Sequence, residues 1–210
     1  MYAVVSKEKI QLPSGTVMRV PGTWQDYCQL RNSRGDSALP RIKFCKGEIL
    51  LMSPMPKHGR EAHLLARIVE VLLESQTRNY EAFTPITMEL PQEGGIEPNY
   101  CFYIANWQAV VGQERIDWRN SLPPDLVIEV DVTSYTTVED YLPYRVPEVW
   151  LWRKAELSIY QLEGDRYVQQ RFSQYFSDVA LPRWVEQVLQ TASERGTGFA
   201  IQELRKQVLR

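Results

Sequence analysis

Hydrophobic positions along the chain follow two different periods. Between residues 59 and 76, Leu64, Leu65, Ile68 and Leu72 recur at helical spacing, which predicts an amphipathic helix that covers one face of a sheet. Elsewhere the apolar residues form short runs or alternate with polar ones, which is typical of β-strands. The predicted strands are residues 41–45, 48–52, 83–90, 99–104, 126–132, 149–153, 157–162 and 166–170. Near the C-terminus, helices are predicted over 181–190 and 200–209.

Capping and turn residues place the boundaries of these elements. Thr23 is an N-cap candidate for a short helix from Trp24 to about Arg31. Lys46-Gly47 lies between two apolar runs and predicts a hairpin turn, while residues 91–95 are typical of a loop. One long helix among many strands, followed by C-terminal helices, predicts an α+β layer architecture.

The chain has 210 residues, of which 44% are hydrophobic and 24% charged, and its net charge is −2. These values predict one domain over residues 1–210, with a core at about 20–170 and a helical extension at about 180–210. The acidic balance disfavours a broad basic face for nucleic acid but allows a local basic groove. We expect a cytoplasmic protein, because the chain shows no secretory signal, no membrane-spanning run and no disulfide-like cysteine pattern.

Acidic and apolar residues alternate along the predicted strand at residues 126–132. Asp125, Glu129 and Asp131 share one face of this strand, and the other face is entirely apolar. Carboxylates this close repel one another, and a divalent cation such as Mg²⁺ or Mn²⁺ relieves the repulsion through hard oxygen ligands. A face that points into water explains the same alternation. The sequence leaves both interpretations open.

Other polar positions surround this strand in the predicted fold. Asn99 begins a strand after Pro98, and Glu48 follows the hairpin turn, where a surface role is the alternative. His58 and His63 fall on different faces of a helix, which disfavours a two-histidine metal site. His58 either faces the site or orders the loop after Pro56. The nearby aromatic residues favour core packing, with stacking on bases as the alternative; they are Tyr135, Tyr141, Tyr144, Trp150 and Trp152.

The order of short motifs resembles the Uma-type family of "putative restriction endonuclease" domains, which is abundant in cyanobacteria and belongs to the PD-(D/E)XK nuclease superfamily. The resemblance covers about residues 20–170. Its motifs are Gly47-Glu48, Met52-Ser53-Pro54 with His58, Glu97-Pro98-Asn99, Pro124 to Val130, and Tyr141 with Val146 to Trp150.

This resemblance implies a restriction-endonuclease-like fold, in which helices flank a mixed β-sheet. It also implies Mg²⁺-dependent hydrolysis of DNA, in which carboxylates hold the metal and the metal lowers the pKa of an attacking water. The residues implied at the Mg²⁺ or Mn²⁺ site are Glu48, Asn99, Glu129 and Asp131, with His58 as a further catalytic position. A homodimer is expected, because such nucleases cut two strands.

Two positions depart from the family pattern. Asn99 replaces an aspartate, so it keeps a carbonyl ligand but loses the charge that attracts a metal. Asp131 stands at the usual lysine position, and no lysine occurs between Lys57 and Lys154, not even near Thr137, where related families place one. The sequence therefore leaves three functions open: an impaired metal-dependent endonuclease, a catalytically inactive binding or structural module, and an acidic-site enzyme of another class.

Overall fold

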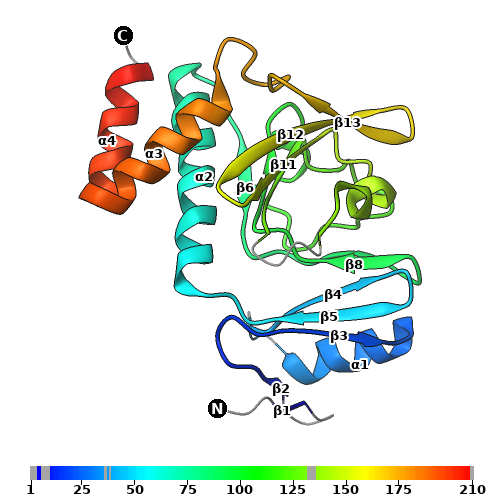
Figure 1. Cartoon of the computed structure of the whole chain (residues 1–210). Helices are drawn as coiled ribbons and strands as arrows, with labels where there is room; N and C mark the ends of the chain where they lie inside the picture. Colours follow the sequence, from blue (N-terminus) through cyan, green and yellow to red (C-terminus); the bar gives the residue numbers. More distant parts are fainter. Residues whose placement is uncertain (1–3, 6–9, 36, 38, 132–135, 209–210) are drawn as a thin grey trace.

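Two main β-sheets, with helices on their outer faces, build the protein (Figure 1). The computed structural model describes residues 4–5, 10–35, 37, 39–131 and 136–208. A five-stranded antiparallel sheet has the order β3 (Val17–Pro21), β5 (Glu48–Met52), β4 (Arg41–Cys45), β8 (Gly94–Ile96) and β7 (Met88–Leu90). A six-stranded sheet has the order β13 (Arg166–Gln170), β12 (Glu156–Glu163), β11 (Glu148–Arg153), β10 (Leu126–Val130), β9 (Tyr100–Tyr103) and β6 (Glu81–Phe83).

The six-stranded sheet is mixed, because β10 and β11 run parallel while its other neighbouring strands pair antiparallel. The short strands β1 (Val4–Val5) and β2 (Ile10–Gln11) form a separate pair near the N-terminus. The helices are α1 (Trp24–Arg34), α2 (Pro56–Ser75), α3 (Leu181–Arg195) and α4 (Thr197–Val208), with short 3₁₀ helices η1 (Trp107–Ala109) and η2 (Val138–Tyr144). Within the described ranges, no helix is both long and apolar enough to cross a membrane.

Helix α2 covers one face of the six-stranded sheet. Its buried stripe, which includes Leu65 and Ile68, packs in one apolar cluster with Leu126, Ile128 and Val130 of β10. Helices α3 and α4 pack against α2 and against each other at the edge of the molecule (Figure 1). This burial of an amphipathic helix against a sheet is the main apolar contribution to the fold.

The other face of the six-stranded sheet meets the five-stranded sheet. Val127 and Leu151 pack there with Tyr141 and Tyr144 of η2 and with Ile96 of β8. Strands β4 and β5 turn alternate residues away from this contact and towards α1, where Ile42, Phe44, Ile49 and Leu51 surround Tyr27. Of the remaining residues of these strands, Arg41, Lys43, Leu50 and Met52 line a cavity with Glu129 of β10.

The predicted fold class is confirmed: helices flank a mixed sheet, with added N-terminal strands and C-terminal helices. The N-cap at Thr23 and the Lys46-Gly47 turn are also confirmed, and Asp26 completes a capping box with Thr23. Helix α2 begins earlier than predicted, at Pro56, since proline suits the first turn of a helix. The core role of the aromatic residues is confirmed for Tyr141, Tyr144, Trp150 and Trp152, all of which are buried.

The observed strands differ from the predicted ones at three places. Residues 83–90 do not form one strand, because the chain leaves one sheet after β6 and enters the other at β7, with Pro85 between them. Gly94 and Gly95 belong to β8 rather than to a loop, and β3 was not predicted. Val132, Tyr135 and Leu209, which enter predictions made above, lie outside the described residues.

The contact between Gly95 and Tyr27 provides a test of this packing. A Cβ atom at Gly95 would lie 2.4 Å from the hydroxyl oxygen of Tyr27 and 2.5 Å from its Cζ atom. Because Tyr27 is fully buried, we expect Gly95→Ala to lower the free energy of unfolding by about 1–3 kcal/mol in urea titrations.

Gly198→Ala in α4 is the matched control, since no atom lies within 4 Å of the added Cβ. We expect this control to be neutral or to gain up to about 1 kcal/mol from helix propensity. Equal unfolding midpoints for the two variants would contradict the described contact.

Candidate functional site

A small cavity lies where β4 and β5 face the end of β10. Its volume is about 30 Å³, which leaves room for about two water molecules. Three carboxylates and two cations line it together with a few apolar and hydroxyl side chains. The lining comprises Arg41, Ile42, Lys43, Leu50, Met52, Ile96, Glu97, Glu129, Val130, Asp131, Thr136 and Tyr141. The cavity thus collects ionisable groups from three separate segments of the chain.

Glu129 is the central carboxylate of this cavity. It is 7% exposed, and it accepts hydrogen bonds from the Tyr141 hydroxyl at 2.9 Å and from the Thr136 hydroxyl at 3.3 Å. Burial raises the pKa of Glu129 above its usual value of 4.5, while the positive charges of Arg41 and Lys43 oppose that rise. Burial and the neighbouring Glu129 also raise the pKa of Tyr141, so Tyr141 stays a hydrogen-bond donor.

Asp131 is bound by an arginine of the neighbouring strand. Arg153 of β11 donates to one carboxylate oxygen of Asp131 from Nη2 at 2.7 Å and from Nε at 3.1 Å. The same oxygen accepts the backbone N–H of Thr136 at 3.2 Å. A cation therefore lies beside the position where the family motif has lysine, but it comes from a different strand.

Asn99 joins β10 to the first turn of α2. Its Oδ1 atom accepts the backbone N–H of Val130 at 2.8 Å, and its Nδ2 atom lies 2.8 Å from Nε2 of His58. Because a backbone N–H can only donate, the amide oxygen must face Val130 and the amide N–H₂ must face His58. The Nε2 atom of His58 is then the acceptor, and the imidazole proton is on Nδ1.

His58 is a buried, neutral imidazole. It is 2% exposed, and its Nδ1 atom has no hydrogen-bond partner in the described part of the chain. Burial and, to a smaller extent, the charge of Arg41 lower its pKa from 6.5 to about 4. Through its bond to Asn99, His58 acts as a positioning residue that connects α2 to β10.

Glu48 and Asp125 lie apart from Glu129. The Glu48 side chain is 42% exposed and pairs with Arg19, whose Nε donates to it at 2.8 Å. It lines a separate depression with Lys43 and Asp140.

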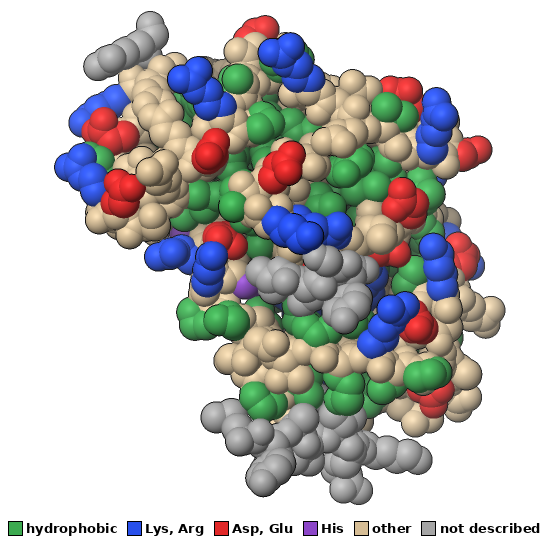
Figure 2. Space-filling view, viewed as in Figure 1, with side chains coloured by type: hydrophobic (Ala, Val, Ile, Leu, Met, Phe, Trp, Pro, Cys, Tyr) green, Lys and Arg blue, Asp and Glu red, His purple; other side chains and the backbone are tan. Residues whose placement is uncertain are grey.

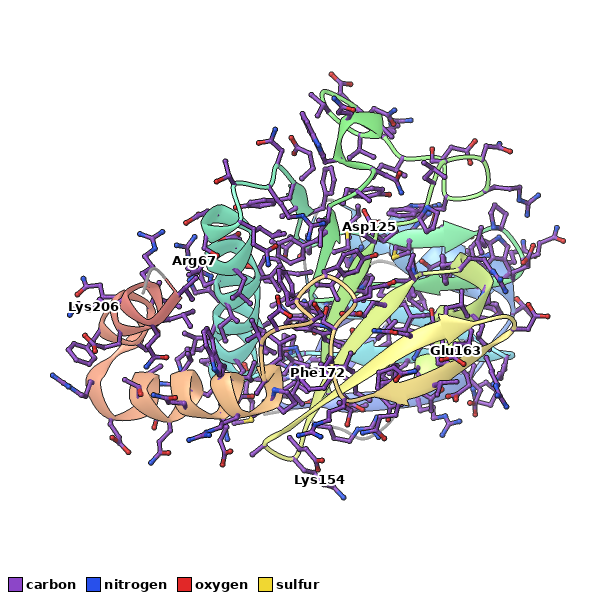
Figure 3. The ribbon with its side chains drawn as sticks, turned by 90° about the horizontal axis from the view of Figure 1, so that it is seen from above. Arg67, Asp125, Lys154, Glu163, Phe172 and Lys206 are labelled. Carbon is purple, nitrogen blue, oxygen red and sulfur yellow. The ribbon has the colours of Figure 1, made fainter. Side chains whose placement is uncertain are left out.

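Asp125 lies inside the molecule (Figure 3) and accepts backbone N–H groups of residues 104, 105 and 106. Its second oxygen accepts the hydroxyl of Tyr175 at 3.3 Å. Asp125 therefore fixes the loop after β9.

The structure thus brings together Glu129, Asp131 and Asn99, with His58 behind Asn99, but not Glu48. The expectation that Asp125 shares the site with Glu129 is corrected, because Asp125 binds three backbone N–H groups instead. The interpretation of a face that points into water is also wrong, since Asp125, Glu129 and Asp131 are all buried.

Sequence reasoning missed three charged residues of this site. Arg41 and Lys43 come from β4, and Arg153 comes from β11. The alternation of Arg41 and Lys43 with Ile42 and Phe44 indicates one cationic face of a strand. Nothing local to that strand, however, places this face against β10.

The site does not fit a magnesium ion as described. Mg²⁺ requires several oxygen ligands in near-octahedral geometry, usually with at least one free carboxylate. No group of three or more His, Cys, Asp or Glu side chains in the described residues is arranged to hold a metal. Asn99 and Asp131 are already bonded to protein donors, and Arg41 and Lys43 add positive charge to the cavity.

The buried state of His58 predicts a specific acid sensitivity. Below its ordinary pKa of 6.5 the unfolded chain binds the imidazole proton, while the folded chain does so only near pH 4. The free energy of unfolding therefore falls as the pH falls through this window, by about 2 kcal/mol between about pH 7 and pH 4.5.

We expect His58→Gln to lose this part of the pH dependence in urea titrations. The matched control is His63→Gln, because His63 is exposed on the same helix. Titration of the other groups is common to all three proteins and cancels in the comparison. An unchanged pH dependence in His58→Gln would show that His58 is not buried in its neutral form.

Comparisons with known proteins agree with this fold. No curated protein matches the chain. A crystal structure of a "putative nuclease belonging to DUF820" from Anabaena variabilis ATCC 29413 is similar, with a TM-score of 0.52 and 15% sequence identity. The similarity covers 90% of this chain and 100% of that chain, and at this identity it supports the fold alone. The family described as "Uma2: Putative restriction endonuclease" matches residues 24–192, a range that contains the cavity and α2. The chain therefore belongs to the Uma2 family.

Proposed function

We propose that this Uma2-family protein binds DNA but does not hydrolyse its phosphodiester bonds. One observation carries the proposal: every residue at an expected metal position already has a partner within the protein. Asn99 bonds to Val130 and His58, Asp131 pairs with Arg153, Glu129 accepts from Tyr141, and Glu48 pairs with Arg19 in a separate depression.

A groove away from this cavity offers a surface for DNA. It has a volume of about 1090 Å³ and lies between the C-terminal end of α1, the segment from β6 to β7, and residues 113–120. Four arginines line it, together with three acidic residues and two half-buried aromatic residues. They are Arg31, Arg34, Arg115 and Arg119, then Glu89, Glu114 and Asp117, and Phe83 and Trp118. Positive side chains interleaved with aromatic rings are typical of grooves that bind unpaired nucleotides.

The charges in this groove differ in their availability. Arg31 pairs with Glu89 and Arg34 pairs with Glu97, so both are largely neutralised. Arg119 also pairs with Glu93, at 3.4 Å. Arg115 is exposed, and no described residue forms an ion pair with it, so it is free to contact a phosphate.

Positive and negative side chains are also mixed outside the groove. On the face shown in Figure 2, Lys and Arg side chains are interspersed with Asp and Glu rather than gathered in one area. We therefore propose a local contact with DNA in this groove rather than a broad basic surface, and single-stranded DNA as its first ligand.

Plasmid nicking tests the absence of hydrolysis. We expect no nicking by the wild type with Mg²⁺ or Mn²⁺, and none by Glu129→Ala, with EDTA reactions as the baseline. Asn99→Asp tests whether the amide alone prevents cleavage. Nicking by the wild type that Glu129→Ala abolishes would overturn the proposal.

Fluorescence anisotropy with a labelled single-stranded oligonucleotide tests the groove. We expect Trp118→Ala to weaken binding by about 1–3 kcal/mol, because a stacked base loses its platform. Arg115→Gln should reduce the slope of log affinity against log salt by about 1. Arg166→Gln, on the exposed edge strand β13, removes the same charge elsewhere and should leave binding unchanged. Equal affinities for all four proteins would exclude the groove.

A second candidate function is metal-dependent cleavage, and the position of Lys43 favours it. The strands between residues 57 and 154 contain no lysine, yet Lys43 of β4 lines the same cavity as Glu129. Against this role, the Lys43 ammonium forms an ion pair with Asp140 at 2.5 Å and is therefore not free to contact an attacking water molecule. The nicking assay decides between the two functions. The homodimer remains a prediction for either.

A further inference from the structure

The Glu129 cavity contains its own cations in a place where its family relatives are expected to hold a metal. We propose that Arg41 and Lys43 are built-in counter-ions that replace a divalent cation in this cavity, so that removing their charge makes the cavity able to bind one. This inference deepens the proposed function and rests on it, because it gives the physical reason why a metal is excluded.

The geometry of β4 fixes both cations in the cavity. Ile42 and Phe44 are buried against α1, so the alternation of the strand turns Arg41 and Lys43 to the opposite face. In the antiparallel register, Arg41 lies opposite Met52 and Lys43 lies opposite Leu50. Both of these apolar side chains also line the cavity. The positive charges are therefore built on a central strand of the sheet, not on a loop that can withdraw.

Charges in and around the cavity cancel without a metal. The lining contributes three carboxylates and two cations, and their direct ion-pair partners add one carboxylate and two cations. These residues are Glu97, Glu129, Asp131, Arg41 and Lys43 in the lining, and Asp140, Arg34 and Arg153 as partners. A divalent cation would leave an excess of two positive charges in a cavity of about 30 Å³. An uncompensated buried charge is expensive, so such a site disfavours the metal.

The electrostatic environment of Glu129 agrees with this role. Arg41 and then Lys43 are the strongest influences that favour its ionised form against burial. They act as the metal would, by stabilising a carboxylate that is out of water. The ion pair with Asp140 holds the ammonium of Lys43 in place.

Manganese binding measured by electron paramagnetic resonance tests the proposal without any activity assay. The signal of free aqueous Mn²⁺ falls when the ion binds protein, so each variant can be titrated directly. The series comprises the wild type, Arg41→Gln, Lys43→Gln and the double variant, each alone and combined with Asn99→Asp.

We expect no Glu129-dependent binding of Mn²⁺ to the wild type. The double variant combined with Asn99→Asp should bind Mn²⁺ at least about tenfold more tightly than Asn99→Asp alone, a difference of about 1.4 kcal/mol. Adding Glu129→Ala should abolish the gained binding. The Asn99→Asp change suits the site, because His58 can move its proton to Nε2 and donate it to the new carboxylate.

Matched controls remove the same charges at exposed positions. Lys46→Gln changes the hairpin turn, and Arg166→Gln changes the edge strand β13. Their double variant with Asn99→Asp should bind Mn²⁺ no better than Asn99→Asp alone. Circular dichroism and thermal unfolding confirm that each protein is folded before titration.

If the Lys43→Gln variants do not fold, Mn²⁺ binding by Arg41→Gln combined with Asn99→Asp tests the proposal. Its structural cost is small, because the Arg41 guanidinium makes a long hydrogen bond of 3.5 Å to the carbonyl of Glu97. Two results would overturn the proposal: Glu129-dependent Mn²⁺ binding by the wild type, or folded charge-removal variants that bind no better than the controls. Wild-type protein that binds Mn²⁺ in this way but does not nick plasmid would overturn this inference alone, and leave the proposed DNA binding standing.

Discussion

The burial of strand β10 on both of its faces is the constraint on which the rest of the structure depends. Every residue of the strand is buried, with α2 on one side and η2 with the five-stranded sheet on the other. A strand in this position cannot leave a carboxylate unpartnered, because an isolated buried charge is far more costly than a buried methyl group. Asp125, Glu129 and Asp131 must therefore find donors or cations inside the protein.

Each carboxylate meets that requirement with a different kind of partner. Asp125 accepts hydrogen bonds from backbone N–H groups, and Asp131 pairs with the guanidinium of Arg153. Glu129 accepts a hydrogen bond from the Tyr141 hydroxyl and is stabilised by the positive charges of Arg41 and Lys43. The mutual repulsion of carboxylates on one strand, which suggests a metal, is thus relieved by protein groups. The amide of Asn99 fits this arrangement, because it donates to His58 and accepts from Val130 without adding a buried charge.

Membership of the Uma2 family and this local chemistry answer different questions. The family match and the similar crystal structure concern the fold, which supports many activities. Function depends on whether particular oxygen atoms are free to bind a ligand. In the described site those atoms are bonded, whereas Arg115 in the second groove is exposed and has no ion-pair partner among the described residues.

The sequence by itself determined the elements whose evidence lies within a few residues. Helix α2, the hairpin at Lys46-Gly47, the cap at Thr23 and the alternation along β10 all follow from local periodicity, capping and turn chemistry. The order of the motifs also indicated the family, so Glu129, Asp131 and Asn99 could be named as neighbours before any fold was known.

Only the tertiary structure decided which of these residues meet and what they meet. It separated Asp125 from Glu129, moved Glu48 to Arg19, divided residues 83–90 between two sheets, and brought Arg41 and Lys43 against β10. The physical reason is that a strand shows its own alternating faces, but which partner covers each face depends on the packing of segments far away in the chain. The charge balance of the site is a property of that packing, and no single segment contains it.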